Sequence, residues 1–214
     1  PSYTSDIIDV GIQKSCVEHV VPEAVTAEEF ETAQMMMTED EASLWQSLYV
    51  QDGDVYRLTE TSEKKLDEID EQLVLPLIMN YQMSAMEESA FKSYVVSQSG
   101  MDAAQLDAMS IEQIGQMMGV SLTPFEQEKE DDDGNAYTAV CVDVRPVFAQ
   151  MKQAGMMDED TILSMRESME TTIDTMGSSM VKSMGVAYAV ACDKAAGLDV
   201  DAMQTSYLWS AGLK

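Results

Sequence analysis

Apolar residues recur every three or four positions through most of the chain, and this spacing predicts a mostly helical protein. The first such row crosses residues 5–21, where Ile8, Ile12 and Cys16 share one helical face. The last long row crosses residues 159–196 and ends before Gly197. We therefore expect about seven helices, several of them short.

Helix starts are marked by capping residues. Thr26, Thr38 and Ser110 are each followed three positions later by Glu or Gln, which is the pattern of a capping box. A long helix is expected to begin at Ser62, and Pro76 should kink or interrupt it because proline lacks an amide donor.

Residues 120–144 depart from the helical pattern. Val140, Val142 and Val144 alternate with less apolar positions, which is typical of a strand with one buried face. The sequence Asp133-Gly134 favours a tight turn before this strand. The fold class is therefore mostly α, of the α+β type, with helices packed around a small antiparallel β-hairpin or sheet.

The length of 214 residues suits one large domain or two small ones. We expect a single domain over residues 1–214. Within it we expect an N-terminal helical half (1–98), the hairpin (120–144) and a C-terminal helical part (146–210).

The charge balance restricts the partners. There are 39 acidic residues against 12 basic ones, so the formal net charge is −27. Such a chain repels phosphate backbones and anionic lipid, which excludes nucleic acid as a simple electrostatic partner. The acidity either serves solubility or attracts cations or a basic partner. No apolar run reaches the roughly 20 residues that a membrane-spanning helix needs, so no membrane span is expected.

Methionine is unusually frequent, with 19 residues. A row at helical spacing could bind Cu(I) through its thioethers, although Ile173 within the row favours ordinary core packing. An adaptable apolar surface for a partner is the third reading. Three consecutive methionines point in different directions on a helix, so at least one of them should be exposed or lie at an interface. The candidate partner-binding residues are Met35, Met36, Met37, Met165, Met169, Met176, Met180 and Met184.

The histidine and the cysteines form a second candidate constellation. Cys16 and His19 lie three positions apart, and Cys141 and Cys192 could complete a four-ligand zinc site. The alternatives are a disulfide between Cys16 and Cys192, plain buried cysteines, and a solvent-facing His19.

The acidic run before Gly134 is a third candidate site. Asp131, Asp132 and Asp133 could attract a cation such as Ca²⁺, because calcium prefers oxygen ligands at this density. The spacing does not match an EF-hand, since Ala136 and Val142 stand where glycine and glutamate are required. A solvated hairpin tip is the simpler interpretation.

No catalytic motif is present, and any histidine-dependent catalysis would have to use His19. We therefore predict a non-catalytic binding protein that presents Met-rich helical surface and an acidic exterior to a protein or a small apolar ligand. The alternatives are a soft-metal protein binding copper or zinc, and a carboxylate-dependent hydrolase. No cofactor is predicted beyond Cu(I), Zn²⁺ or Ca²⁺. Export to a bacterial periplasm or the outside is favoured, with the cytoplasm as the alternative location. The sequence leaves the oligomeric state open.

Overall fold

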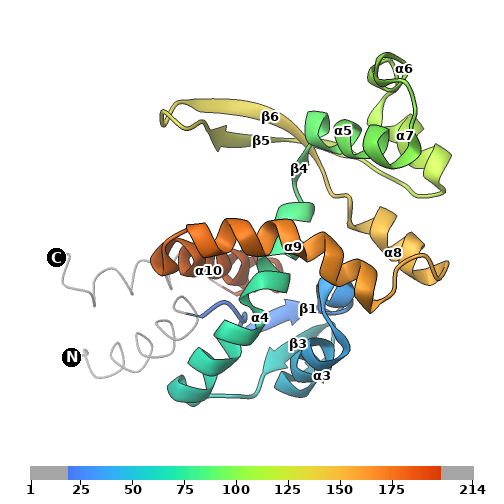
Figure 1. Cartoon of the computed structure of the whole chain (residues 1–214). Coiled ribbons are helices and arrows are strands. Elements are labelled where there is room, and N and C mark those ends of the chain that lie inside the picture. The colour runs from blue at the N-terminus through green and yellow to red at the C-terminus, as the bar shows by residue number, and fades with distance from the viewer. Residues whose placement is uncertain (1–18, 199–214) are drawn as a thin grey trace. The chain divides into compact units, whose positions relative to one another are not determined.

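The computed structural model describes residues 19–198 (Figure 1). This part of the chain contains nine α-helices, one 3-10 helix and two three-stranded antiparallel sheets. The expectation of a mostly helical α+β protein is confirmed, although the described helices outnumber the seven expected and there are two sheets. None of the described helices combines the length and the apolar character that crossing a membrane requires.

The chain divides into two compact units. Unit 1 contains the described residues up to Met79 and those from Glu159 onward, and unit 2 contains Asn80–Asp158. Nothing in the sequence pattern indicated this division, and the expectation of a single domain stays a prediction.

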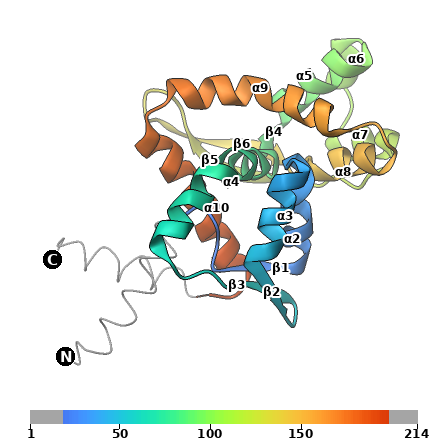
Figure 2. The ribbon, with the colours of Figure 1, turned by 60° about the horizontal axis from the view of Figure 1, so that its bottom comes forward.

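Unit 1 contains a sheet with the strand order β1-β3-β2, which Figure 2 shows with the three strands side by side. Its strands are antiparallel, and Gly53 takes a φ of 66° in the turn between β2 and β3. The elements of unit 1 are β1 (Ala24–Thr26), α2 (Ala27–Thr32), the 3-10 helix η1 (Ala33–Met36), α3 (Glu39–Leu48), β2 (Tyr49–Asp52), β3 (Val55–Leu58), most of α4 (Glu63–Met83), α9 (Glu159–Thr175) and α10 (Ser178–Ala195).

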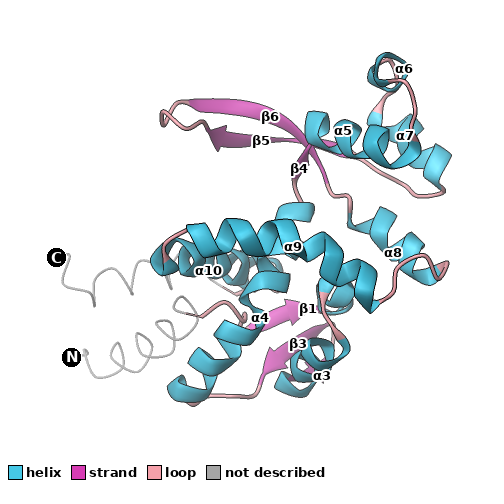
Figure 3. Cartoon of the chain, viewed as in Figure 1, coloured by secondary structure: helices cyan, strands magenta, loops and turns pink. Residues whose placement is uncertain are grey.

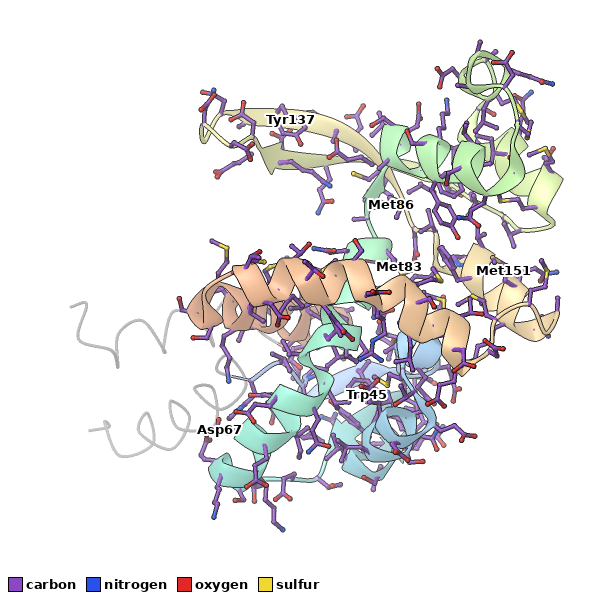
Figure 4. The ribbon with its side chains drawn as sticks, viewed as in Figure 1. Trp45, Asp67, Met83, Met86, Tyr137 and Met151 are labelled. Atoms are coloured by element: carbon purple, nitrogen blue, oxygen red, sulfur yellow. The ribbon has the colours of Figure 1, made fainter. Side chains whose placement is uncertain are left out.

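An aromatic cluster packs α2 and α3 against this sheet. Phe30 stacks on Tyr56 with 3.9 Å between ring centroids, and Trp45 lies 4.8 Å from Tyr49. The Trp45 indole Nε1 donates a hydrogen bond to the Phe30 carbonyl at 3.0 Å, so its polar atom is satisfied inside the core (Figure 4).

The expected helix caps are present. Thr26 accepts a hydrogen bond from the Glu29 amide, while Thr38 and Ser110 form complete capping boxes with Glu41 and Gln113. These motifs are local in sequence, which is why they were predictable.

The expectation of a single helix over residues 159–196 is wrong, because two helices, α9 and α10, occupy this range. The chain leaves helical geometry at Met176-Gly177, and Gly177 is extended, with φ −70° and ψ 147°. Glycine is a poor helix former, so a break here costs little. In contrast, α4 continues through Pro76 without interruption, where the flanking Leu73 and Leu77 are fully buried. Packing on both sides therefore offsets the one hydrogen bond that proline removes.

The helix expected over residues 5–21 lies mostly outside the described residues. Its last residues, His19–Val21, are described, and they form a buried, non-helical segment that leads into β1.

Unit 2 contains the expected hairpin, with Asp133-Gly134 at its tip and a sheet order of β4-β6-β5 (Figure 3). Cys141 and Val142 are both buried, but Val140 is 44% exposed, so a buried face exists only near β4. The elements of unit 2 are β4 (Met86–Glu87), α5 (Glu88–Ser99), α6 (Ala103–Asp107), α7 (Ile111–Met118), β5 (Pro124–Glu130), β6 (Ala136–Val142) and α8 (Arg145–Gln153), together with the end of α4.

Gly185 of α10 allows the segment before β1 to pack closely on this helix. A Cβ added at Gly185 would lie 2.2 Å from Val20 Cγ1 and 2.9 Å from Val20 Cβ. We expect Gly185→Ala to lower the free energy of unfolding by about 1–3 kcal/mol, because overpacking outweighs the better helix propensity of alanine.

Urea unfolding of the Gly185→Ala variant tests this expectation. Gly177→Ala is the matched control, since an added Cβ there meets no atom within 4 Å and φ is negative. Equal stability of the two variants would show that Val20 does not pack on α10 in this way.

Candidate functional site

His19 lies at the centre of a polar cluster in unit 1. The residue is 2% exposed, so the expectation of a solvent-facing histidine is wrong. Its Nδ1 lies 2.7 Å from Asp70 Oδ2, and its Nε2 lies 2.8 Å from Glu63 Oε2. These contacts form because the buried chain segment at His19 runs beside α4. We name His19, Glu63, Asp67, Asp70 and Lys182 the His19 cluster.

Helix α4 supplies all three carboxylates of the His19 cluster. Glu63, Asp67 and Asp70 are spaced by four and then three residues, so they lie on one face of the helix. Asp70 is buried, whereas Asp67, labelled in Figure 4, is largely exposed. The Asp67 Oδ1 lies 3.8 Å from His19 Nδ1. The cluster therefore has a buried end at Asp70 and a side open to solvent at Asp67.

Asp70 joins three parts of unit 1. Its Oδ1 accepts a hydrogen bond from the Val20 amide at 3.0 Å, and its Oδ2 faces both His19 and the Lys182 ammonium of α10, the latter at 2.7 Å. Charge-assisted hydrogen bonds of this kind are stronger than neutral ones. Asp70 thus fixes the His19 segment to α4 and α10.

Opposing effects act on the pKa of His19. Burial lowers it, but the hydrogen bonds and negative charges of Asp70 and Glu63 act in the other direction and together outweigh burial. The pKa of His19 is therefore raised, and in the protonated form both ring nitrogens donate to carboxylates.

Among the described residues, carboxylates lie against His19. Cys192 is buried in α10 of unit 1, and Cys141 is buried in β6 of unit 2. Cys16 lies outside the described residues. The four-ligand zinc site and the Cys16–Cys192 disulfide therefore stay predictions.

Met35, Met36 and Met37 are all buried, so the expectation that at least one is exposed or lies at an interface is wrong. The reason is the backbone: the helix tightens into η1, and Met37 then takes an extended conformation with φ −94° and ψ 146°. The three side chains consequently do not diverge as they would on a regular α-helix.

The second methionine row is divided by the break between α9 and α10. Met165, Met169 and Met176 are half-buried on one side of the break, and Met184 is half-buried on the other. Within this row only Met180 is largely exposed. Copper binding and partner binding by this methionine row both stay predictions.

The β5–β6 hairpin of unit 2 carries a surface that the sequence analysis did not single out. Glu126, Glu128 and Glu130 alternate along β5 and are all exposed; we name them the acidic edge. Among the described residues, no strand pairs with the outer side of β5. The alternation Glu-Gln-Glu-Lys-Glu within a strand was the signal that could have identified it.

Apolar side chains accompany the acidic edge. Phe125 is 40% exposed, Tyr137 is 39% exposed and Val140 is 44% exposed, and all three belong to the hairpin. Figure 4 labels Tyr137 on β6. Phe125 and Tyr137 occupy alternate positions to the glutamates in the register, so they lie on the opposite face from the acidic edge.

The acidic loop is closed by its own first aspartate. The Asp131 carboxylate accepts hydrogen bonds from the Asn135 amide at 2.8 Å and the Asp133 amide at 3.0 Å. These amides, Asn135 foremost, lower the pKa of Asp131. The Asp131 carboxylate therefore stabilises the turn itself. Calcium binding by Asp131, Asp132 and Asp133 stays a prediction.

Comparison with protein families, curated proteins and solved structures finds no match to this chain.

Proposed function

We propose that this is a non-catalytic binding protein that takes an extended, basic segment of another protein alongside β5. The observation that carries the proposal is the acidic edge, with Glu126, Glu128 and Glu130 exposed on one face of a strand whose outer side has no described partner. The acidic exterior of the whole chain, with its net charge of −27, favours the approach of a basic partner.

Backbone pairing supplies the first part of the binding. An end strand presents amide and carbonyl groups along its open side, and an extended segment can add to it as a further strand. Two acidic edges from two copies of the chain would repel each other, so a basic segment is favoured over self-pairing.

Side-chain spacing supplies the specificity. Residues two apart in a strand lie on the same face, about 7 Å apart, so lysine or arginine at every second position of the partner would meet the acidic edge. The residues between them would lie on the opposite face, where the exposed Phe125 of β5 favours an apolar contact. The partner is thus an extended segment with alternating basic and apolar residues.

The methionine-rich surface first expected for this function receives less support. Met35, Met36 and Met37 are buried, and within the row of α9 and α10 only Met180 is largely exposed. The hairpin therefore replaces the methionines as the proposed contact surface.

A fluorescent peptide of alternating lysine and valine tests the proposal by anisotropy. Replacing the acidic edge with Glu126→Gln, Glu128→Gln and Glu130→Gln together should weaken binding about tenfold, since three opposite-charge pairs contribute roughly 0.5 kcal/mol each.

The control removes the same charge from exposed helical positions of the two units, Glu68→Gln, Glu71→Gln and Glu112→Gln. The proposal expects the control to bind almost as tightly as the unmodified protein. An equal loss in both triple variants would mean that the peptide responds to the net charge alone, and the proposal would then fail.

A further inference from the structure

The His19 cluster contains a set of ligand atoms that converge on one point. His19 Nδ1 and one carboxylate oxygen each from Asp67 and Asp70 all lie within 4.8 Å of one another. Nitrogen together with carboxylate oxygen suits zinc and similar divalent transition ions, whereas calcium prefers oxygen ligands alone.

The observed distances are close to those of a metal centre. With bonds of about 2.0–2.2 Å, two ligands of a tetrahedral ion lie about 3.3 Å apart. His19 Nδ1 is 2.7 Å from Asp70 Oδ2 and 3.8 Å from Asp67 Oδ1, so shifts of about half an ångström on each side suffice. Asp67 is exposed and free to make such a shift.

The surroundings of these three residues have the arrangement that orients metal ligands. Glu63 Oε2 lies 2.8 Å from His19 Nε2, where it can hold the Nε2 proton and leave the Nδ1 lone pair for an ion. The Val20 amide holds Asp70 Oδ1, which directs Oδ2 towards His19. A histidine with a carboxylate on its outer nitrogen is usual for metal-binding histidines.

In this structure a positively charged side chain, that of Lys182, already binds the Asp70 carboxylate. The Lys182 ammonium lies 2.7 Å from Asp70 Oδ2, the same oxygen that would bind an ion. The Lys182 side chain is 41% exposed and has a flexible stem, so it can move out into solvent. Lysine and metal would therefore compete for Asp70.

We propose that His19, Asp67 and Asp70 bind a divalent transition-metal ion such as Zn²⁺, and that Lys182 takes the place of this ion in the metal-free protein. Three protein ligands leave the fourth position of a tetrahedral ion to water. Glu63 acts as the positioning residue for the histidine. This site is separate from the hairpin, so its test does not depend on the proposed partner.

Isothermal titration of the full chain with Zn²⁺, and the visible spectrum of the Co²⁺-loaded protein, test the proposal. Asp67→Asn should weaken Zn²⁺ binding at least tenfold, and Glu63→Gln should weaken it about 10- to 100-fold. The neighbouring exposed residue provides the control: Glu68→Gln removes one charge from α4 and should leave the affinity unchanged.

Lys182→Met distinguishes a metal site from a purely structural ion-pair cluster. Removal of the competing ammonium should raise the Zn²⁺ affinity several-fold, whereas a structural cluster would lose stability and gain no affinity. Unchanged or weaker binding by this variant would overturn the proposed competition.

Cys16→Ser distinguishes the carboxylate site from the thiol set considered from the sequence. The proposal expects full Zn²⁺ affinity and a Co²⁺ spectrum without thiolate charge-transfer bands. A loss of binding in Cys16→Ser, or equal binding by Asp67→Asn and the unmodified protein, would assign the metal to other residues.

Discussion

Replacing Arg166 with alanine should lower the free energy of unfolding by about 3–5 kcal/mol, the usual cost of breaking a buried ion pair. Arg166 of α9 is buried, and its guanidinium makes two hydrogen bonds to the Glu41 carboxylate, at 2.7 and 3.0 Å. Its Nη1 also donates to the Met36 carbonyl at 3.3 Å. These contacts attach α9 to α3 and to η1 within unit 1.

The expected loss is large because Glu41 has a second role. Its carboxylate accepts a hydrogen bond from the Thr38 amide at 3.0 Å and completes the capping box of α3. Without Arg166 this mostly buried carboxylate loses its counter-charge, and a movement of the carboxylate towards solvent would disturb the cap as well.

Urea unfolding at neutral pH measures the loss, and the double variant Arg166→Met/Glu41→Gln tests its cause. Glutamine retains the capping box, and methionine fills the space without a charge. The Arg166 Nε has no hydrogen-bond partner in the described structure, so removal of the guanidinium also removes an unsatisfied group. The double variant should therefore recover at least half of the loss. A single-variant loss below about 1 kcal/mol would contradict a buried pair.

Local features of the fold could be predicted, and features made by distant residues could not. The capping boxes at Thr38 and Ser110 and the turn at Asp133-Gly134 depend on neighbours within a few positions. The sheet of unit 1 depends on β1, a strand of three residues in which Ala24 pairs with Arg57. No local pattern identifies so short a strand, because tertiary pairing forms it.

The His19 cluster was only partly predictable for a similar reason. The single histidine was recognised as a candidate ligand, but its expected partners were cysteines. Glu63, Asp67 and Asp70 share a helical face that, in sequence, is indistinguishable from an ordinary solvated acidic face. Only the approach of the His19 segment and of Lys182 makes Asp70 a buried residue.

Asp193 is a further buried carboxylate whose role depends on tertiary contacts. It lies in α10, it is 1% exposed, and it accepts a hydrogen bond from the Ala24 amide of β1 at 3.0 Å. Burial is the largest effect and raises the pKa of Asp193 to about 7, with the charge of Glu23 adding to it and the amides of Ala24 and Glu23 opposing it.

The raised pKa makes unit 1 less stable as the pH rises. In the unfolded chain Asp193 has its ordinary pKa of 3.8, so between about pH 4 and 7 the folded protein binds more protons than the unfolded one. Stability from this group is complete below pH 4, declines up to about pH 7 and is lost above it. A shift of about three pKa units corresponds to about 4 kcal/mol.

Asp193→Asn should remove this pH dependence, since asparagine resembles the protonated carboxyl and can still accept from Ala24. The variant should match the unmodified protein near pH 4 and exceed its unfolding free energy at pH 8 by up to about 4 kcal/mol. Urea unfolding of both proteins at each pH measures the difference, in which the titration of His19 and of the other acids cancels. If the difference did not change between pH 4 and 8, Asp193 would be ionised throughout. The hydrogen bonds from Ala24 and Glu23 would then outweigh burial in setting its charge.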